Sequence, residues 1–151
     1  MKDLNKEIDF QGVYKINTKG NVKLLIDSIV RPNGIAFFPE EKQLIIANSD
    51  PEKPNWYLYN VNDDGSLSNG KIFFSTIGFD KKQKGLPDGL KIDSQGNIFA
   101  TGPGGVWIFD ITGKQVGKIK LAEASSNCAL SADEKTLFIT NHMQVLRLKM
   151  R

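Results

Sequence analysis

The sequence is a succession of short runs rich in β-branched and aromatic residues, each ended by residues that favour turns. No segment keeps a helical repeat of apolar positions over three turns. The turns at 17–20, 63–65, 93–96 and 112–113 each supply a glycine, which tolerates the positive φ that tight hairpins need. The pattern predicts an all-β fold with thirteen strands, over residues 12–17, 22–28, 34–38, 43–48, 56–61, 71–76, 90–93, 97–101, 106–110, 115–121, 128–130, 136–141 and 144–150.

Three similar units cover residues 32–48, 87–101 and 126–141. Each reads as a polar residue, an apolar strand, a turn and a second apolar strand, and the opening residues Asn33, Asp88 and Asn127 lie 55 and 39 positions apart. Four strands per repeat of roughly 40–50 residues are typical of β-propeller blades. We therefore predict one partial β-propeller over residues 1–151 with about three blades, of which the first is incomplete and the last has three strands. Because closed propellers usually have four to eight blades, the chain is expected to form part of a ring.

Composition narrows the class of protein. The net charge of +3 is mild and spread along the chain, so we expect no nucleic-acid partner. No apolar run approaches the roughly 20 residues of a membrane-spanning helix, and the first ten residues lack the apolar stretch of a signal peptide. These features favour a cytoplasmic protein with no membrane partner. The single cysteine, Cys128, excludes a disulfide within the chain and is interpreted as a small core residue.

The polar residues at the blade starts are the candidate site. The first strand of a blade is innermost and pairs with the second in a hairpin, so the start of one and the end of the other meet at one mouth of the central channel. The residues expected at that mouth are Asn33, Asp88, Asn127, Asn48, Thr101 and His142. Carboxylate and amide oxygens that converge from separate blades suit a hard cation such as calcium. Alternatively, Asn33 and Asp88 only form tight turns with the glycines that follow them.

Specific motifs lie at the predicted blade edges, among them Arg31-Pro-Asn-Gly-Ile-Ala-Phe37, Leu86-Pro-Asp-Gly-Leu90 and Asp93-Ser-Gln-Gly-Asn97. Two more are Ala100-Thr-Gly-Pro-Gly-Gly-Val-Trp107 and Ser126-Asn-Cys-Ala129. Together they resemble the senescence marker protein, gluconolactonase and regucalcin family, in particular its bacterial gluconolactonase-like members. The resemblance implies a six-bladed propeller, of which this chain corresponds to the C-terminal half. It also implies one divalent metal, calcium or zinc, at a channel mouth.

The same resemblance implies roles for individual residues. Asn33 and Asp88 match two metal ligands of the family, and Asp88 is also the candidate catalytic base, although a ligand role alone stays open. The third family ligand, a glutamate of the first blade, has no counterpart here, and Glu7 is not assigned to it. The implied activity is metal-dependent hydrolysis of a sugar lactone. His142 is interpreted either as a proton shuttle at the mouth or as a hydrogen-bonded residue of its rim.

A second hypothesis makes the chain a non-catalytic propeller fragment that serves as a binding or assembly module. An arc of three blades leaves two blade faces uncovered, so a protein partner is expected. Two arcs related by a two-fold axis would form a homodimer. Two copies of thirteen strands, however, contain two strands more than six four-stranded blades need. The other candidate partner is a missing N-terminal half.

Overall fold

The computed structural model describes residues 5, 7–80 and 82–150, so residues 1–4, 6, 81 and 151 of the predicted domain lie outside its described part. The described residues form thirteen strands and one short 3₁₀ helix, η1 (Pro39–Glu41), which confirms the all-β class. The strands are β1 (Val13–Ile16), β2 (Val22–Ile26), β3 (Pro32–Phe37), β4 (Gln43–Asn48), β5 (Asn55–Val61), β6 (Leu67–Ser75), β7 (Leu90–Ile92), β8 (Ile98–Gly102), β9 (Gly105–Phe109), β10 (Gln115–Lys120), β11 (Ser125–Leu130), β12 (Thr136–Asn141) and β13 (Gln144–Lys149).

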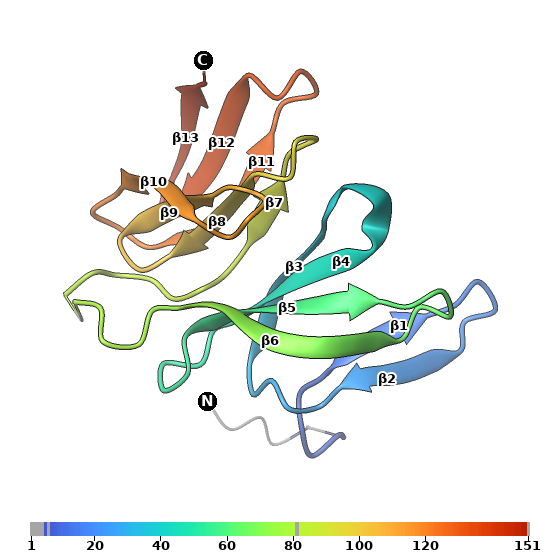
Figure 1. Ribbon diagram of the computed structural model, residues 1–151. Coiled ribbons are helices and arrows are strands. Elements are labelled where there is room, and N and C mark those ends of the chain that lie inside the picture. Colours follow the sequence, from blue (N-terminus) through green and yellow to red (C-terminus); the bar gives the residue numbers. More distant parts are fainter. Residues whose placement is uncertain (1–4, 6, 81, 151) are drawn as a thin grey trace.

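The strands form separate antiparallel sheets that follow one another along the chain. Strands β3–β6 make the first full blade, β7–β10 the second full blade, β11–β13 the three-stranded blade, and β1–β2 a two-stranded sheet. Strand β3 lies beside β7, and β7 lies beside β11, so the first strands of the three blades are neighbours (Figure 1). This arrangement confirms a partial propeller of about three blades with the first strand of each blade innermost.

Aromatic side chains fill the contact between the two full blades. Trp56 of β5 and Trp107 of β9 are each 1% exposed, and their ring centroids lie 6.2 Å apart. Phe74 and Phe109 pack against Trp107 with centroid distances of 5.5 and 6.5 Å. Large rings bury more apolar area than any other side chains, so this layer contributes most to the contact between the blades. It thereby sets how the inner strands β3 and β7 lie against each other.

The other contacts between sheets are mainly aliphatic. The second full blade and the three-stranded blade share a core of Phe99, Val106, Cys128, Leu137 and Ile139. The two-stranded sheet packs on the first full blade through a core of Ile26, Ile29, Leu44 and Ile46. The second full blade therefore packs against a neighbouring blade on each face, whereas Ile35 and Phe37 of β3 in the first full blade are each 48% exposed.

The strand boundaries follow the alternation of the sequence except where polar residues extend a strand. Strands β4 and β12 have the predicted bounds. Strand β6 begins at Leu67, four residues before its predicted start, because Ser68 and neighbouring residues pair with the end of β5 in an irregular register. Strand β11 likewise begins at Ser125, three residues early. Within the described part of the chain, no helix is long and apolar enough to cross a membrane.

Candidate functional site at the inner strands

The strand register shows which residues of the inner strands are equivalent. Inner and second strands pair Ile35 with Ile46, Leu90 with Ala100, and Cys128 with Ile139. Two positions before these inner-strand residues lie Asn33, Asp88 and Ser126. Asn33 and Asp88 therefore occupy equivalent positions in the two full blades, and Ser126 occupies the third such position.

The assignment of Asn127 to that position is wrong by one residue. A bulge between Ser125 and Asn127 shifts the pairing of β11, and a bulge of this kind redirects the side chains that follow it. The Asn127 side-chain oxygen accepts a hydrogen bond from the backbone N–H of Cys128 at 2.9 Å. Asn127 packs against Gly89 of the second full blade, where Lys91 Nζ lies 3.4 Å from its Oδ1, and it lines a separate hollow with Phe138 and Val145.

Gly34 brings the two full blades together at the site. A Cβ atom on Gly34 would collide with the carbonyl oxygen of Asp88 and lie 2.8 Å from the Leu90 side chain. Neither Gly34 nor Gly89 has a positive φ, and Asn33 lies within strand β3. The glycine after Asn33 is therefore required for close approach of the backbones, and the tight-turn interpretation of Asn33 does not hold.

A chain of hydrogen bonds fixes the Asn33 side chain. Its Nδ2 atom donates to Ser49 Oγ at 3.1 Å, and Ser49 Oγ donates to the carbonyl oxygen of Pro87 at 2.6 Å. Ser49 thus links β3 to the segment that carries Asp88. The Asn33 side chain also donates a hydrogen bond to the Asp88 carboxyl, so its amide contacts both Ser49 and Asp88.

The Asp88 carboxyl is half-buried beside Asn33. Burial raises the pKa of Asp88 above its ordinary value, while hydrogen bonds from the Gly89 backbone and the Asn33 side chain oppose the rise. The backbone N–H of Asp88 donates to the carbonyl oxygen of Thr101 at 3.1 Å, which holds the residue against β8. A partly desolvated carboxylate with few partners is the kind of group that binds a cation or exchanges a proton.

A pocket of about 420 Å³ opens beside Asp88. His142 and Glu123 line it, together with Gly85, Leu86, Ala124, Ser125 and Ser126. Lys84 Nζ lies 2.7 Å from Glu123 Oε1, and this contact lowers the pKa of the Glu123 carboxyl. Neither Glu123 nor Lys84 could be predicted at the site, because both lie in loops between strands, where no periodic pattern applies.

His142 reaches this pocket from the tight turn between β12 and β13. Its backbone N–H donates to the carbonyl oxygen of Ala124 at 3.0 Å, and its φ of 50° lies in the left-handed region. The residue is exposed and lines the pocket together with Asp88. Its proximity to Glu123 lowers the pKa of that carboxyl, although less than Lys84 does.

Asn48 and Thr101 do not line the pocket. Asn48 is 1% exposed; its Oδ1 accepts from Arg31 N at 3.0 Å and its Nδ2 donates to Lys53 O at 2.8 Å. Thr101 is fully buried, and its hydroxyl donates to the carbonyl oxygen of Gly89 at 2.8 Å. The prediction that Asn48 and Thr101 lie at the channel mouth is therefore wrong. Both side chains are buried, and their hydrogen bonds hold the backbone next to Asn33 and Asp88.

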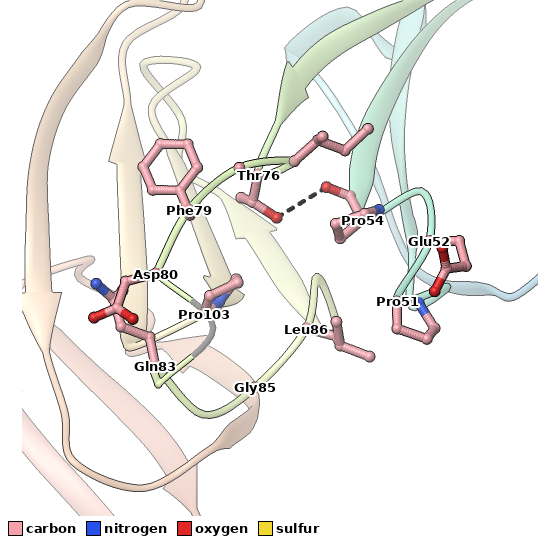
Figure 2. Close-up of a pocket in the computed structure, with 12 residues that line it drawn as sticks. Pro51, Glu52, Pro54, Thr76, Phe79, Asp80, Gln83, Gly85, Leu86 and Pro103 are labelled. Carbon is pink, nitrogen blue, oxygen red and sulfur yellow. Dashed lines mark hydrogen bonds between the residues drawn. The ribbon is translucent and has the colours of Figure 1, made fainter.

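A second pocket of about 420 Å³ adjoins the first and shares Gly85 and Leu86 with it (Figure 2). It lies between the two full blades, with Phe79 and Asp80 on one side and Pro54 on the other. Thr76 Oγ1 donates to the carbonyl oxygen of Pro54 at 3.0 Å. Asp88 and Asn33 do not line it. The candidate site is therefore assigned to the pocket that contains Asp88.

The donors at Asn33 and Asp88 fit a hard cation. Among the described residues, no group of three or more His, Cys, Asp and Glu side chains is close enough to hold a metal, so the site offers one carboxylate and one amide oxygen. Calcium accepts such oxygen ligands in irregular geometry and completes its shell with water. Zinc sites are usually built from histidine and cysteine ligands, which are not grouped in the described residues.

Cys128 lies in the core and is expected to be inert. Its side chain is 4% exposed, its Sγ lies 3.2 Å from the carbonyl oxygen of Phe99, and burial raises its pKa to about 11. Because the thiolate is the reactive form, we expect no labelling by Ellman's reagent at pH 8 in the native protein and complete labelling in urea. Rapid labelling of the native protein would contradict this placement.

Comparisons with known proteins agree with the fold. Residues 1–143 match the SMP-30/Gluconolactonase/LRE-like region family. The chain is 36% identical over 148 residues to a gluconolactonase of Zymomonas mobilis, covering 95% of this chain and 42% of that protein. It is 26% identical over 163 residues to a lactonohydrolase of Aspergillus oryzae, covering 91% of this chain and 34% of that protein.

Solved structures share the fold of this chain. A gluconolactonase of Xanthomonas campestris superposes with a TM-score of 0.84 at 27% identity, over 96% of this chain and 46% of that one. A calcium-binding regucalcin of Agrobacterium tumefaciens superposes with a TM-score of 0.73 at 20% identity, over 93% of this chain and 54% of that one, which shows a shared fold. The chain thus spans about half the length of the proteins that it matches. On the match over residues 1–143, it belongs to the SMP-30/gluconolactonase/LRE-like family.

Proposed function

We propose that this chain carries part of the active site of a metal-dependent hydrolase of sugar lactones. The observation that supports it most is the placement of Asn33 and Asp88 at equivalent positions on adjacent inner strands, with Asp88 beside an open pocket. The chain also belongs to a family with gluconolactonases among its members. The proposed substrate is a small cyclic ester of a sugar acid.

In this proposal Asn33 Oδ1 and the Asp88 carboxylate hold a divalent cation, most simply calcium, with zinc as the alternative. When bound, the cation supplies Lewis-acid polarisation of the lactone carbonyl and positive charge for the oxyanion. Ser49 keeps the Asn33 amide turned for this role through its hydrogen bond of 3.1 Å. Two protein ligands leave room in the coordination shell for water and substrate.

Asp88 is also proposed as the group that positions or deprotonates the attacking water. Burial raises the pKa of its carboxyl, which makes the carboxylate a stronger base than an exposed aspartate. Ser126 and His142 line the same pocket and are proposed to contact the hydroxyl groups of the substrate. Asn127, Asn48 and Thr101 have no part in this step, because their side chains are held elsewhere.

The assay that tests this function is lactone hydrolysis followed in a pH-stat with gluconolactone, corrected for spontaneous ring opening. We expect turnover that a chelator abolishes and that Asp88→Asn lowers on the order of 100-fold. The matched control is Asp63→Asn, an exposed aspartate in the turn after β5. Turnover that survives both the chelator and Asp88→Asn would contradict the metal mechanism.

The second candidate function is a non-catalytic binding or assembly module. It is favoured by the small number of cation ligands and by the uncovered ends of the arc. Under this alternative the chain would bind its partner normally and show no turnover above spontaneous opening in the same assay.

A further inference from the structure

An ion pair lies at the edge of the pocket that contains Asp88. Lys84 Nζ donates to both carboxylate oxygens of Glu123, at 2.7 and 2.8 Å, and Glu123 lines the pocket together with Asp88. The chain has 20 Lys and Arg residues and 17 Asp and Glu residues, yet this is the one ion pair among the residues that the structure describes. It joins the segment before Asp88 to the loop between β10 and β11.

Stability does not account for the position of this pair. The side chains of Lys84 and Glu123 are 58% and 40% exposed, and ion pairs so open to solvent contribute little to folding. The backbone of both residues is held without the pair, because Gly104 N donates to Lys84 O at 2.8 Å and Asn141 Nδ2 donates to Glu123 O at 2.7 Å. The pair therefore acts on the pocket more than on the fold.

The pair keeps the Glu123 carboxylate ionised and in place at the pocket wall. The hydrogen bond from Lys84 lowers the pKa of Glu123, and the nearby His142 adds to this effect. An ionised carboxylate can accept about four hydrogen bonds, so one ammonium group leaves part of that capacity free. Hydroxyl groups that donate to a carboxylate make short, charge-assisted hydrogen bonds. Glu123 can therefore accept hydrogen bonds from a ligand that lies beside Asp88.

We infer that Glu123 is a specificity-determining residue that accepts hydrogen bonds from ring hydroxyl groups of the substrate, and that Lys84 is the positioning residue that orients it. The inference rests on the proposed lactonase function and names the lactones that the site selects, those with free hydroxyl groups on the ring. A site built to hydrogen-bond a hydroxyl group discriminates strongly against a ligand that lacks it, because the polar group of the protein is then left unpaired.

Kinetics with two lactones of the same ring size test the role of Glu123. Gluconolactone carries hydroxyl groups on its ring, and δ-valerolactone carries none. We expect Glu123→Gln to lower the ratio of kcat/KM for gluconolactone to kcat/KM for δ-valerolactone roughly tenfold, mainly through KM. The matched control is Glu134→Gln, since Glu134 Oε2 accepts from Ser94 Oγ at 2.6 Å in another contact between loops, outside the pocket. An unchanged ratio in Glu123→Gln would overturn the inference.

Two variants of Lys84 separate positioning from a general effect on the fold. Lys84→Ala is expected to lower the same ratio by raising KM for gluconolactone, because Glu123 loses its orienting partner. Lys84→Arg keeps the positive charge and the N–H donors and is expected to restore most of the ratio. Equal losses for the two lactones, without rescue by arginine, would overturn the assignment of Lys84.

A binding measurement separates this inference from lactonase activity. The probe 1,5-anhydroglucitol has the ring and hydroxyl groups of gluconolactone but no ester, and tetrahydropyran has the same ring without hydroxyl groups. By saturation-transfer NMR we expect the native chain to bind the first and not the second, and Glu123→Gln to lose most of the signal. This pattern in a chain without turnover would contradict the proposed function and leave hydroxyl recognition by Glu123 standing. No binding to the native chain, or equal binding to Glu123→Gln, would overturn the inference.

Discussion

Replacing Trp107 with alanine is expected to lower the free energy of unfolding by about 3–5 kcal/mol, the range found for large aromatic side chains removed from protein cores. The Trp107 ring is 1% exposed and packs against Trp56, Phe74 and Phe109 between the two full blades. Its Nε1 atom also donates to the carbonyl oxygen of Pro103 at 3.1 Å, so the substitution leaves a buried acceptor unpaired. The loss is a large share of the stability of a typical domain.

The measurement is urea unfolding followed by circular dichroism, with Phe79→Ala as the control. Phe79 contacts the Trp107 ring edge-on at 5.0 Å, but its side chain is 40% exposed in the pocket of Figure 2. Its removal is therefore expected to cost clearly less than the removal of Trp107. Equal effects from the two substitutions would show that the aromatic layer is not the main contact between the full blades.

Replacing Gly34 with alanine is expected to cost about 1–3 kcal/mol and to move Asp88 away from Asn33. The added Cβ atom meets the Asp88 carbonyl oxygen, a backbone atom that cannot swing aside as a flexible side chain can. Strands β3 and β7 must then separate where the two candidate ligands lie. This variant tests whether the packing of the blades and the geometry of the site depend on one another.

The control for Gly34→Ala is Gly117→Ala on β10, where the nearest atom to the added Cβ is the Ile108 Cδ1 at 3.7 Å, an ordinary contact. Gly117 has no positive φ either, so the two substitutions differ mainly in available space. We expect a lower urea midpoint and weaker calcium binding for Gly34→Ala and nearly unchanged values for Gly117→Ala. A stable Gly34→Ala variant with unaltered calcium binding would contradict the close approach.

The number of strands and their grouping into blades could be predicted from the sequence, because alternation and turn glycines are local signals. Strand β4 shows how well this works: its apolar run is bounded by polar residues at both ends, and its bounds were predicted to the residue. Strand β6 shows where prediction from local sequence signals fails. After Leu67 its first residues are Ser68, Asn69 and Gly70, which have low strand propensity and extend the strand because β5 pairs with this segment.

The site was less predictable than the fold, since it depends on side-chain direction and on loops. One bulged residue in β11 puts Ser126, and not Asn127, at the position equivalent to Asp88, and the sequence repeat carries no sign of that bulge. Asn48 and Thr101 lie near the ends of their strands, as predicted, but their side chains are buried in the blades and do not reach the pocket. Glu123 reaches the pocket from a loop, where no repeat could reveal it.

A calorimetric titration with calcium tests whether the proposed ligands Asn33 and Asp88 together hold a divalent cation. For the native chain we predict binding with a dissociation constant on the order of 10⁻⁴–10⁻³ M, because the site has a single carboxylate. Asp88→Ala is expected to abolish the binding heat, while Asp63→Ala, an exposed aspartate in the turn after β5, leaves it unchanged. Equal heats for the native chain and Asp88→Ala would show that Asp88 is not a ligand and would rule out the proposed site.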